Sequence, residues 1–72
     1  MSNKLLVGNL SSSATVADLF DLFGKFGQVE SANVENGVGS VQMSSITDAA
    51  TAKNRLNFSN FDGQILSVRQ LD

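Results

Sequence analysis

Gly37-Val38-Gly39-Ser40-Val41-Gln42-Met43 is the stretch that most clearly predicts a β-strand, and we interpret it as the central strand of a small sheet. Side chains of a strand alternate between its two faces. One face therefore carries Gly39, Val41 and Met43, and the other carries Val38, Ser40 and Gln42. A glycine inside a strand often marks a bulge or a close approach of another backbone or a ligand, and otherwise weakens the strand. We expect the first face to pack on an apolar layer and the second, called the open face below, to stay small, flat and accessible.

The residues just before this stretch predict an antiparallel partner strand. Asn36-Gly37 is the strongest hairpin signal in the chain, because both residue types tolerate the positive φ of a two-residue turn. Val29, Ala32 and Val34 precede the turn and indicate a strand. Two strands joined by so short a turn run antiparallel.

Towards the N-terminus, the sequence predicts a buried strand and then a helix. Residues 4–10 form an apolar run of strand length that ends in turn residues. Thr15 and Asp18 have the spacing of a capping box, so a helix should begin near Val16. The residues expected to form its buried stripe are Leu19, Leu22, Phe23 and Phe26, and Gly27 is expected to end the helix in a left-handed conformation.

Towards the C-terminus, a second helix and a last strand are predicted. Ser45 and Asp48 repeat the capping pattern, and the buried face of the helix is marked by Ala49, Ala52 and Leu56. A loop with an Asp62-Gly63 turn follows, in which Phe61 is expected to fill the core. Phe58 is expected to contact a protein partner, to pack locally or to be an isolated exposed ring. In the last strand, Leu66 and Val68 point to one side, and Ser67 and Arg69 point to the other.

The predicted order of elements is β-α-β-β-α-β, with each helix acting as a crossover. This order implies an α+β, ferredoxin-like split β-α-β fold, in which a four-stranded antiparallel sheet carries both helices on one face. A chain of 72 residues is short, so we expect residues 1–72 to form a single domain with one shared core. The predicted core consists of Leu5, Val7, Leu19, Leu22, Phe23, Val34, Val41, Met43, Ala52, Leu56, Leu66 and Val68.

Composition disfavours several classes of function. With 42% hydrophobic and 17% charged residues, the chain is too apolar for a disordered protein, and its apolar runs are too short to span a membrane. It has no cysteine and no histidine, which removes disulfides, thiolate metal sites and the commonest general base. We therefore expect no enzyme activity, no metal, no cofactor and no membrane partner. The N-terminus shows no signal segment, which favours an intracellular location.

The charge balance bears on nucleic-acid binding. Seven acidic and five basic residues give a net charge of -2. Proteins that bind phosphates usually present a basic surface. The acidic balance therefore lowers the expected affinity for a nucleic acid without excluding contact.

Four segments together resemble the RNA recognition motif (RRM) family. Leu5–Leu10 is similar to the short ribonucleoprotein motif of that family, and Asn36–Met43 is similar to the long one. Asp18–Gly27 matches the pattern of the family's first helix, and Ala49–Val68 matches its second half. The resemblance covers almost the whole chain. It implies the fold derived above and a non-catalytic RNA-binding module of a ribonucleoprotein or RNA-processing protein.

The chain departs from the family at the positions that usually stack on RNA bases. Family members typically carry aromatic rings at the second position of the short motif and at the third and fifth positions of the long motif. Leu6, Val38 and Ser40 occupy these positions here, and Asn36 stands where a basic residue is usual. A base stacked on a ring contributes roughly 1–3 kcal/mol. We therefore expect weak binding of single-stranded RNA that flanking segments assist.

The resemblance implies an RNA site on the open face, flanked by Lys4 and Arg69 at its outer strand positions. These two cations are candidates for phosphate contacts, and Leu6 and Val38 are candidates for apolar platforms. The candidates for hydrogen bonds to bases are Asn33, Ser40 and Gln42. For each of these residues, an ordinary solvated position on a strand is the alternative interpretation.

The alternative function is a protein-interaction RRM. Leu6, Val38 and Leu71 make the open face partly apolar, so it is a candidate surface for a protein partner or for self-association. Phe20 falls outside the buried stripe of the first helix, at a position where the family usually has a polar residue. The outer side of that helix is therefore a second candidate surface.

Overall fold

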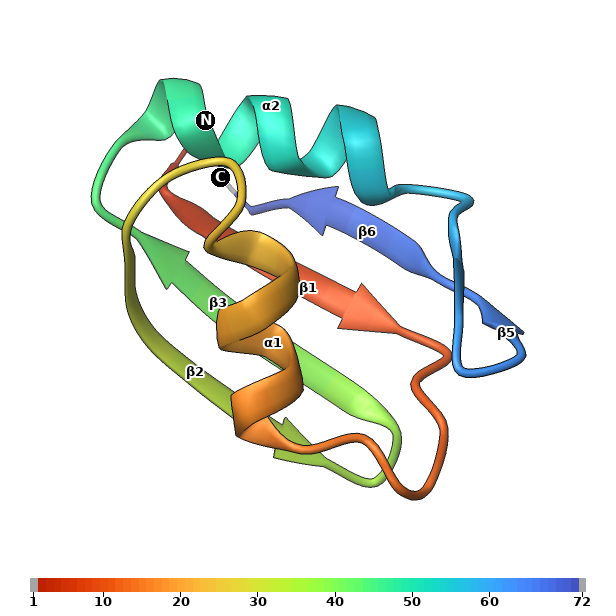
Figure 1. Cartoon of the computed structure of the whole chain (residues 1–72). Coiled ribbons are helices and arrows are strands. Elements are labelled where there is room, and N and C mark those ends of the chain that lie inside the picture. The colour runs from red at the N-terminus through yellow and green to blue at the C-terminus, as the bar shows by residue number, and fades with distance from the viewer. Residues whose placement is uncertain (1, 72) are drawn as a thin grey trace.

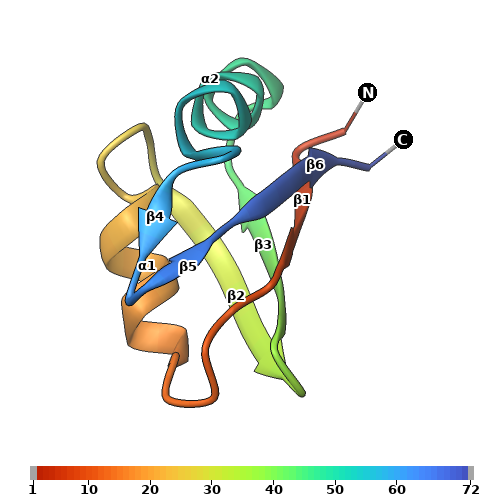
Figure 2. The same ribbon diagram turned by 90° about the vertical axis from the view of Figure 1, so that its right-hand side faces the viewer.

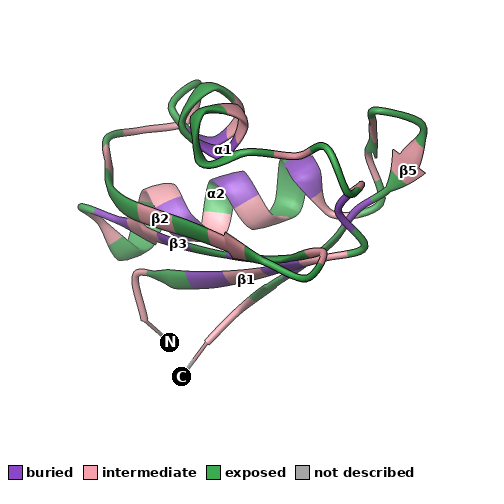
Figure 3. Ribbon diagram, turned by 90° about the horizontal axis from the view of Figure 1, so that it is seen from below, coloured by how far each residue is buried: buried purple, intermediate pink, exposed green. Residues whose placement is uncertain are grey.

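The computed structural model describes residues 2–71, which form one sheet of four strands, a small hairpin and two helices (Figure 1). The elements are β1 (Lys4–Gly8), α1 (Val16–Phe23), β2 (Val29–Glu35), β3 (Val38–Met43), α2 (Ile46–Leu56), β4 (Asn60–Phe61), β5 (Gln64–Ile65) and β6 (Ser67–Gln70). Both helices cover the same face of the sheet, and the opposite face is open (Figure 3).

The order of strands in the main sheet is β2-β3-β1-β6, and every neighbouring pair is antiparallel. In β3, Val41 pairs with Leu5 on one side and with Ala32 on the other. The strand predicted to be central is therefore an interior strand. The α+β split β-α-β fold predicted from the sequence is confirmed.

The two turns with Asx-Gly sequences both have the geometry that the sequence predicts. Asn36 has φ 52° and Gly37 has φ 79°, which is the pattern of a type I′ turn between β2 and β3. Asp62 and Gly63 repeat the pattern with φ 56° and 82°. The second turn closes a hairpin of β4 and β5, whose two short strands the sequence analysis took for a loop.

The first helix begins as predicted but ends earlier. The Thr15 side chain accepts a hydrogen bond from the backbone N–H of Asp18, and the Asp18 carboxylate accepts one from the backbone N–H of Thr15. The prediction that Gly27 ends the helix is wrong, because α1 stops at Phe23 and Gly24 is its C-cap. Glycine is a poor helix former, so the helix ends at the first glycine that it meets. Gly27 instead gives room to the Asp48 side chain of α2, which a Cβ atom at this position would strike.

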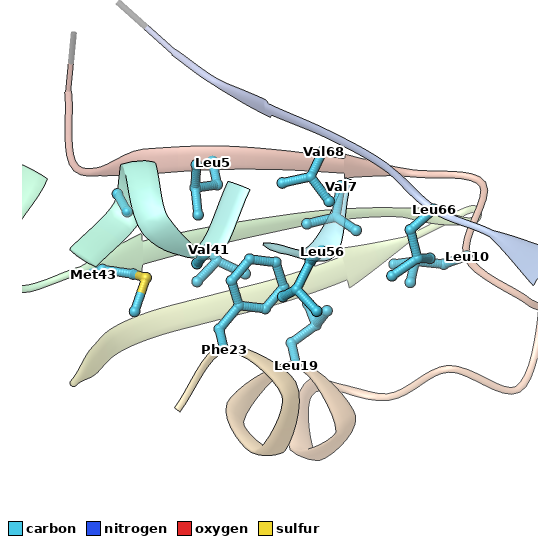
Figure 4. Close-up of a cluster of buried hydrophobic side chains, with 12 residues drawn as sticks. Leu5, Val7, Leu10, Leu19, Phe23, Val41, Met43, Leu56, Leu66 and Val68 are labelled. Atoms are coloured by element: carbon cyan, nitrogen blue, oxygen red, sulfur yellow. The ribbon is translucent and has the colours of Figure 1, made fainter. Parts of the chain in front are cut away.

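The core lies between the sheet and both helices (Figure 4). Ten of the twelve predicted core residues are buried, and Leu10 and Ala49 join them. Leu22 and Val34 are only half-buried, and Phe61 packs at the edge of the core in the same way. Leu22 and Val34 were predicted to belong to the core, and both pack against it from its border.

Gly39 explains why α1 lies so close to β3. A Cβ atom at this position would lie 2.9 Å from Leu19 Cδ1 and 3.0 Å from Leu10 Cδ1, which is too close for real contacts. The glycine therefore permits the close approach that the sequence predicted. It belongs to the packed face and leaves the open face unaffected.

Candidate nucleic-acid interface

One row of side chains crosses all four strands on the open face. Ser40 of β3 pairs with Asn33 of β2 and with Leu6 of β1, and Leu6 pairs in turn with Arg69 of β6. Directly paired residues of antiparallel strands project to the same side of the sheet. The register therefore brings together Asn33, Ser40, Leu6 and Arg69, four of the seven predicted RNA-binding residues, in a line that we call the central row.

A second row lies two residues away, near the chain termini. Gln42 pairs with Ser31 of β2 and with Lys4 of β1, and the backbone N–H of Leu71 donates to the Lys4 carbonyl at 2.9 Å. Two residues of a strand span about 6.8 Å, so the rows are separated by about that distance. A shallow depression of about 220 Å³ lies over this second row, lined by Lys4, Leu5, Ser31, Ser40, Val41, Gln42 and Leu71.

Val38 extends the face towards the β2–β3 turn. It pairs with Glu35 of β2, and 45% of its surface is exposed. Val38 thus lies on the same side as Ser40 and Gln42, as alternation predicts. The three positions where the family usually has rings are adjacent on the open face. Leu6 pairs directly with Ser40, and Val38 precedes Ser40 by two residues in the same strand.

The open face also holds carboxylates that the sequence analysis missed. The register of β2 and β3 shifts between Val29 and Ser31, so Glu30 is the extra residue of a bulge. Its Oε1 atom accepts a hydrogen bond of 3.2 Å from Gln42 Nε2. Glu35 reaches the same face as the partner of Val38.

The missed bulge has a signature in the sequence. The inward residues of the strand are Val29, Ala32 and Val34, and the step from Val29 to Ala32 is odd. A regular strand keeps its inward residues at even spacing, so the odd step indicates one inserted residue.

Charge on the open face is divided between its two sides. Arg69 is on the edge strand β6 and Lys4 begins the interior strand β1, so only one of these two cations lies on an outer strand. Glu30 and Glu35 are both on β2, the opposite edge strand. Phosphates are therefore favoured over β1 and β6 and disfavoured over β2.

The two residues proposed for protein contact lie on opposite sides of the molecule. Leu71 borders the depression on the open face. Phe20 belongs to α1, which covers the other face of the sheet, and 41% of the Phe20 surface is exposed. One partner surface therefore does not include both residues.

Side-chain hydrogen bonds join the β1–α1 loop to the β4–β5 hairpin. The Asp62 carboxylate accepts from Ser11 Oγ at 2.7 Å and from Ser13 Oγ at 2.9 Å. The bond from Ser11 and then that from Ser13 lower the pKa of Asp62 below its ordinary value of 3.8. Asn9 adds two bonds, because its Nδ2 donates to the Ile65 carbonyl and its own carbonyl accepts from Gln64 Nε2.

Residues 2–71 contain no cluster of histidine, cysteine or carboxylate side chains that fits a metal ion. Neither of the helices described is long and apolar enough to cross a membrane.

Comparison with known proteins identifies the family. A sequence model described as the RNA recognition motif matches residues 5–67. The structure of RNA binding protein PG1 is 33% identical, with a TM-score of 0.91, over 94% of this chain and 92% of that one. The RRM3 domain of Gbp2 is 30% identical, with a TM-score of 0.88, over 93% of this chain and 73% of that one.

A solved complex of Sxl-lethal protein with RNA shares the fold. It is 21% identical, with a TM-score of 0.94, and the match covers 100% of this chain and 48% of that one. The search of curated proteins gave no match. The strand order and the placement of both helices agree with the family model that matches residues 5–67. The chain therefore belongs to the RNA recognition motif family.

Proposed function

We propose that this domain binds single-stranded RNA across the open face of its sheet and has no catalytic role. The observation that carries the proposal is the central row, which places a cation, an apolar side chain, a hydroxyl and an amide in line across four strands. The family match supports it, as does the similarity to a protein whose solved structure is named as RNA binding. Single-stranded RNA suits such a surface because its bases are unpaired and can lie flat on a sheet.

Each candidate residue has a defined role in the proposal. Arg69 and Lys4 contact phosphates on the β6 and β1 side of the face. Leu6 and Val38 offer apolar surface to the faces of bases. The hydrogen-bonding groups are Asn33, Ser40 and Gln42, and Gln42 is already held by Glu30 at 3.2 Å.

From the same surface we infer that the binding is weak. The three ring positions hold Leu6, Val38 and Ser40, so the face lacks stacking contacts worth roughly 1–3 kcal/mol per base. Glu30 and Glu35 add negative charge on β2. RNA binding therefore depends on help from flanking segments of a longer protein.

The test compares Arg69→Ala with the matched control Lys25→Ala, which removes an exposed cation between α1 and β2. Binding of a labelled mixed-sequence single-stranded RNA is measured by fluorescence anisotropy at several salt concentrations. Arg69→Ala should weaken binding and lower the slope of log affinity against log salt by about 0.7, because one phosphate contact is lost. The proposal fails if Arg69→Ala, like the control Lys25→Ala, leaves the affinity and the salt slope unchanged. It also fails if the native domain binds no RNA.

Protein binding is the second candidate function, and the exposure of two apolar side chains favours it. Phe20 is 41% exposed on α1, and Val38 is 45% exposed on the open face. Self-association through the open face would also involve Leu6 and Leu71. Concentration-dependent shifts of the Val38 or Phe20 signals in NMR spectra recorded without RNA would support this function.

A further inference from the structure

Phe58 has a backbone conformation that suits glycine. It follows α2 and has a φ of 67°, in the left-handed region. Its N–H donates to the Leu66 carbonyl at 2.9 Å, while the N–H of Leu66 donates to the Ser59 carbonyl at 2.8 Å. This pair of bonds is the pattern of a G1 bulge, in which Phe58 and Ser59 oppose Leu66 and the first residue is normally glycine.

The phenylalanine gains little from the fold in return. Its side chain is 77% exposed, the largest exposed fraction among the large hydrophobic residues described. A bulky residue with positive φ is unfavourable, and a ring in water adds no stabilisation from burial. Exposed aromatic rings held in strained conformations are candidates for ligand contacts.

The neighbouring side chains hold the loop in place. Asn57 Oδ1 accepts a hydrogen bond of 3.0 Å from the N–H of Val68, and Ser59 Oγ donates to the Leu56 carbonyl at 2.6 Å. Both residues that flank Phe58 are thus engaged with the body of the domain. The ring of Phe58 is presented from a fixed backbone.

The charge around Phe58 differs from that of the whole chain. Residues 49–61 contain Lys53 and Arg55, and the acidic residue nearest to Phe58 in the sequence is Asp62, whose carboxylate is bonded to two serine hydroxyls. Arg55 is exposed in the last turn of α2, three residues before Phe58. A polyanion is the partner that this charge favours.

Phe58 also lies near the β6 edge of the sheet. Its bonding partner Leu66 connects β5 to β6, and β6 is the edge strand that carries Arg69 (Figure 2). Ile65, which is 50% exposed, falls on the same side of the chain as Ser67 and Arg69 by alternation. An RNA strand that crosses the sheet and passes over the β6 edge therefore leaves it next to Phe58.

We propose that Phe58 stacks on a base of single-stranded RNA just outside the β6 edge, with Arg55 contacting a nearby phosphate. This inference rests on the RNA-binding function proposed above. It assigns to the α2–β4 connection a ring that compensates in part for those missing from the sheet.

The test uses Phe58→Gly, because glycine suits the left-handed position and removes the ring without harming the fold. Mixed-sequence single-stranded RNAs of about 4 and about 12 nucleotides are titrated, since the short one spans little more than the four strands. Phe58→Gly should weaken binding of the longer RNA about ten-fold, with little change for the shorter one, and Phe58→Tyr should restore it. Ile46→Ala is the matched control, because Ile46 is 51% exposed at the opposite end of α2.

The outcomes separate this inference from the proposed function. Equal affinities of the native domain and Phe58→Gly for the longer RNA, with Arg69→Ala still weakened, would overturn the role of Phe58 alone. Absence of RNA binding by the native domain would overturn both proposals. Binding of an acidic peptide that is lost in Phe58→Gly, in place of RNA, would assign the ring to a protein partner and overturn the base-stacking role.

Discussion

Leu6 is the residue on which the functional interpretation depends most. It lies in the interior strand β1, between Ser40 of β3 and Arg69 of β6 in the central row. Alternation in the sequence was sufficient to place these side chains on the open face, because the inward residues Leu5, Val7 and Val41 are all apolar. The pairing of Leu6 with Ser40 needed the register, which the sequence did not supply.

Restoring rings at these two positions should strengthen RNA binding. Leu6→Tyr combined with Ser40→Phe adds two adjacent platforms on paired strands, and aromatic residues are good strand formers. We expect the double variant to keep the fold and to bind single-stranded RNA at least about ten-fold more tightly, measured by fluorescence anisotropy. Thr51→Tyr, which adds a ring to the exposed side of α2, should give no gain. A folded double variant without higher affinity would favour a protein partner for the open face.

At the scale of elements, the strongly patterned segments were predictable and the irregular ones were not. The Asn36-Gly37 turn and the Thr15 cap follow from local chemistry and were confirmed. The bulge at Glu30 leaves the odd step from Val29 to Ala32 as its single signal, and the two-residue strands of the β4–β5 hairpin are too short to give a periodic pattern. The hairpin is defined instead by contacts distant in sequence, such as those of Asn9 with Gln64 and Ile65.

The hydrogen bonds from Ser11 and Ser13 in the β1–α1 loop to Asp62 in the hairpin should make the stability of the fold depend on pH. The folded-state pKa of Asp62 is lowered below 3.8 by the bonds from Ser11 and Ser13. A lowered pKa means that the carboxylate stabilises the fold above 3.8 and that this contribution is lost as pH falls through the folded-state value. Asp62→Asn should therefore be less stable than the native domain in urea denaturation at pH 7, with a difference that shrinks below about pH 4.

A double variant of the donors provides the check. Ser11→Ala with Ser13→Ala removes the same bonds and keeps the carboxylate, so it should show the same pH-dependent difference from the native domain. A difference for Asp62→Asn that stays constant with pH would contradict this account and point to a change in the turn itself.

At the scale of the whole molecule, the sequence predicted the layers and most of the core. Ten predicted residues are buried because strand alternation and helical spacing point them to one interface. Leu22 and Val34 are only half-buried and pack against the border of a small core, and Val34 belongs to the edge strand β2. In so short a chain, burial at the border depends on tertiary placement more than on pattern.

This difference in burial predicts a difference in stability. Phe23 is fully buried, so Phe23→Ala should cost roughly 3–5 kcal/mol of the free energy of unfolding. Leu22→Ala, the matched control on the same helix, should cost clearly less because Leu22 is half-buried. Urea denaturation of both variants measures the costs, and equal losses would contradict the packing described here.

The most direct test of RNA binding by the open face is an NMR titration of the domain with a mixed-sequence single-stranded RNA. The account predicts that backbone amide signals of the central row shift together and saturate with one affinity, whereas those on the outer side of α1 stay in place. The residues of that row are Asn33, Ser40, Leu6 and Arg69. Shifts confined to the helices, or no shifts at saturating RNA, would contradict it.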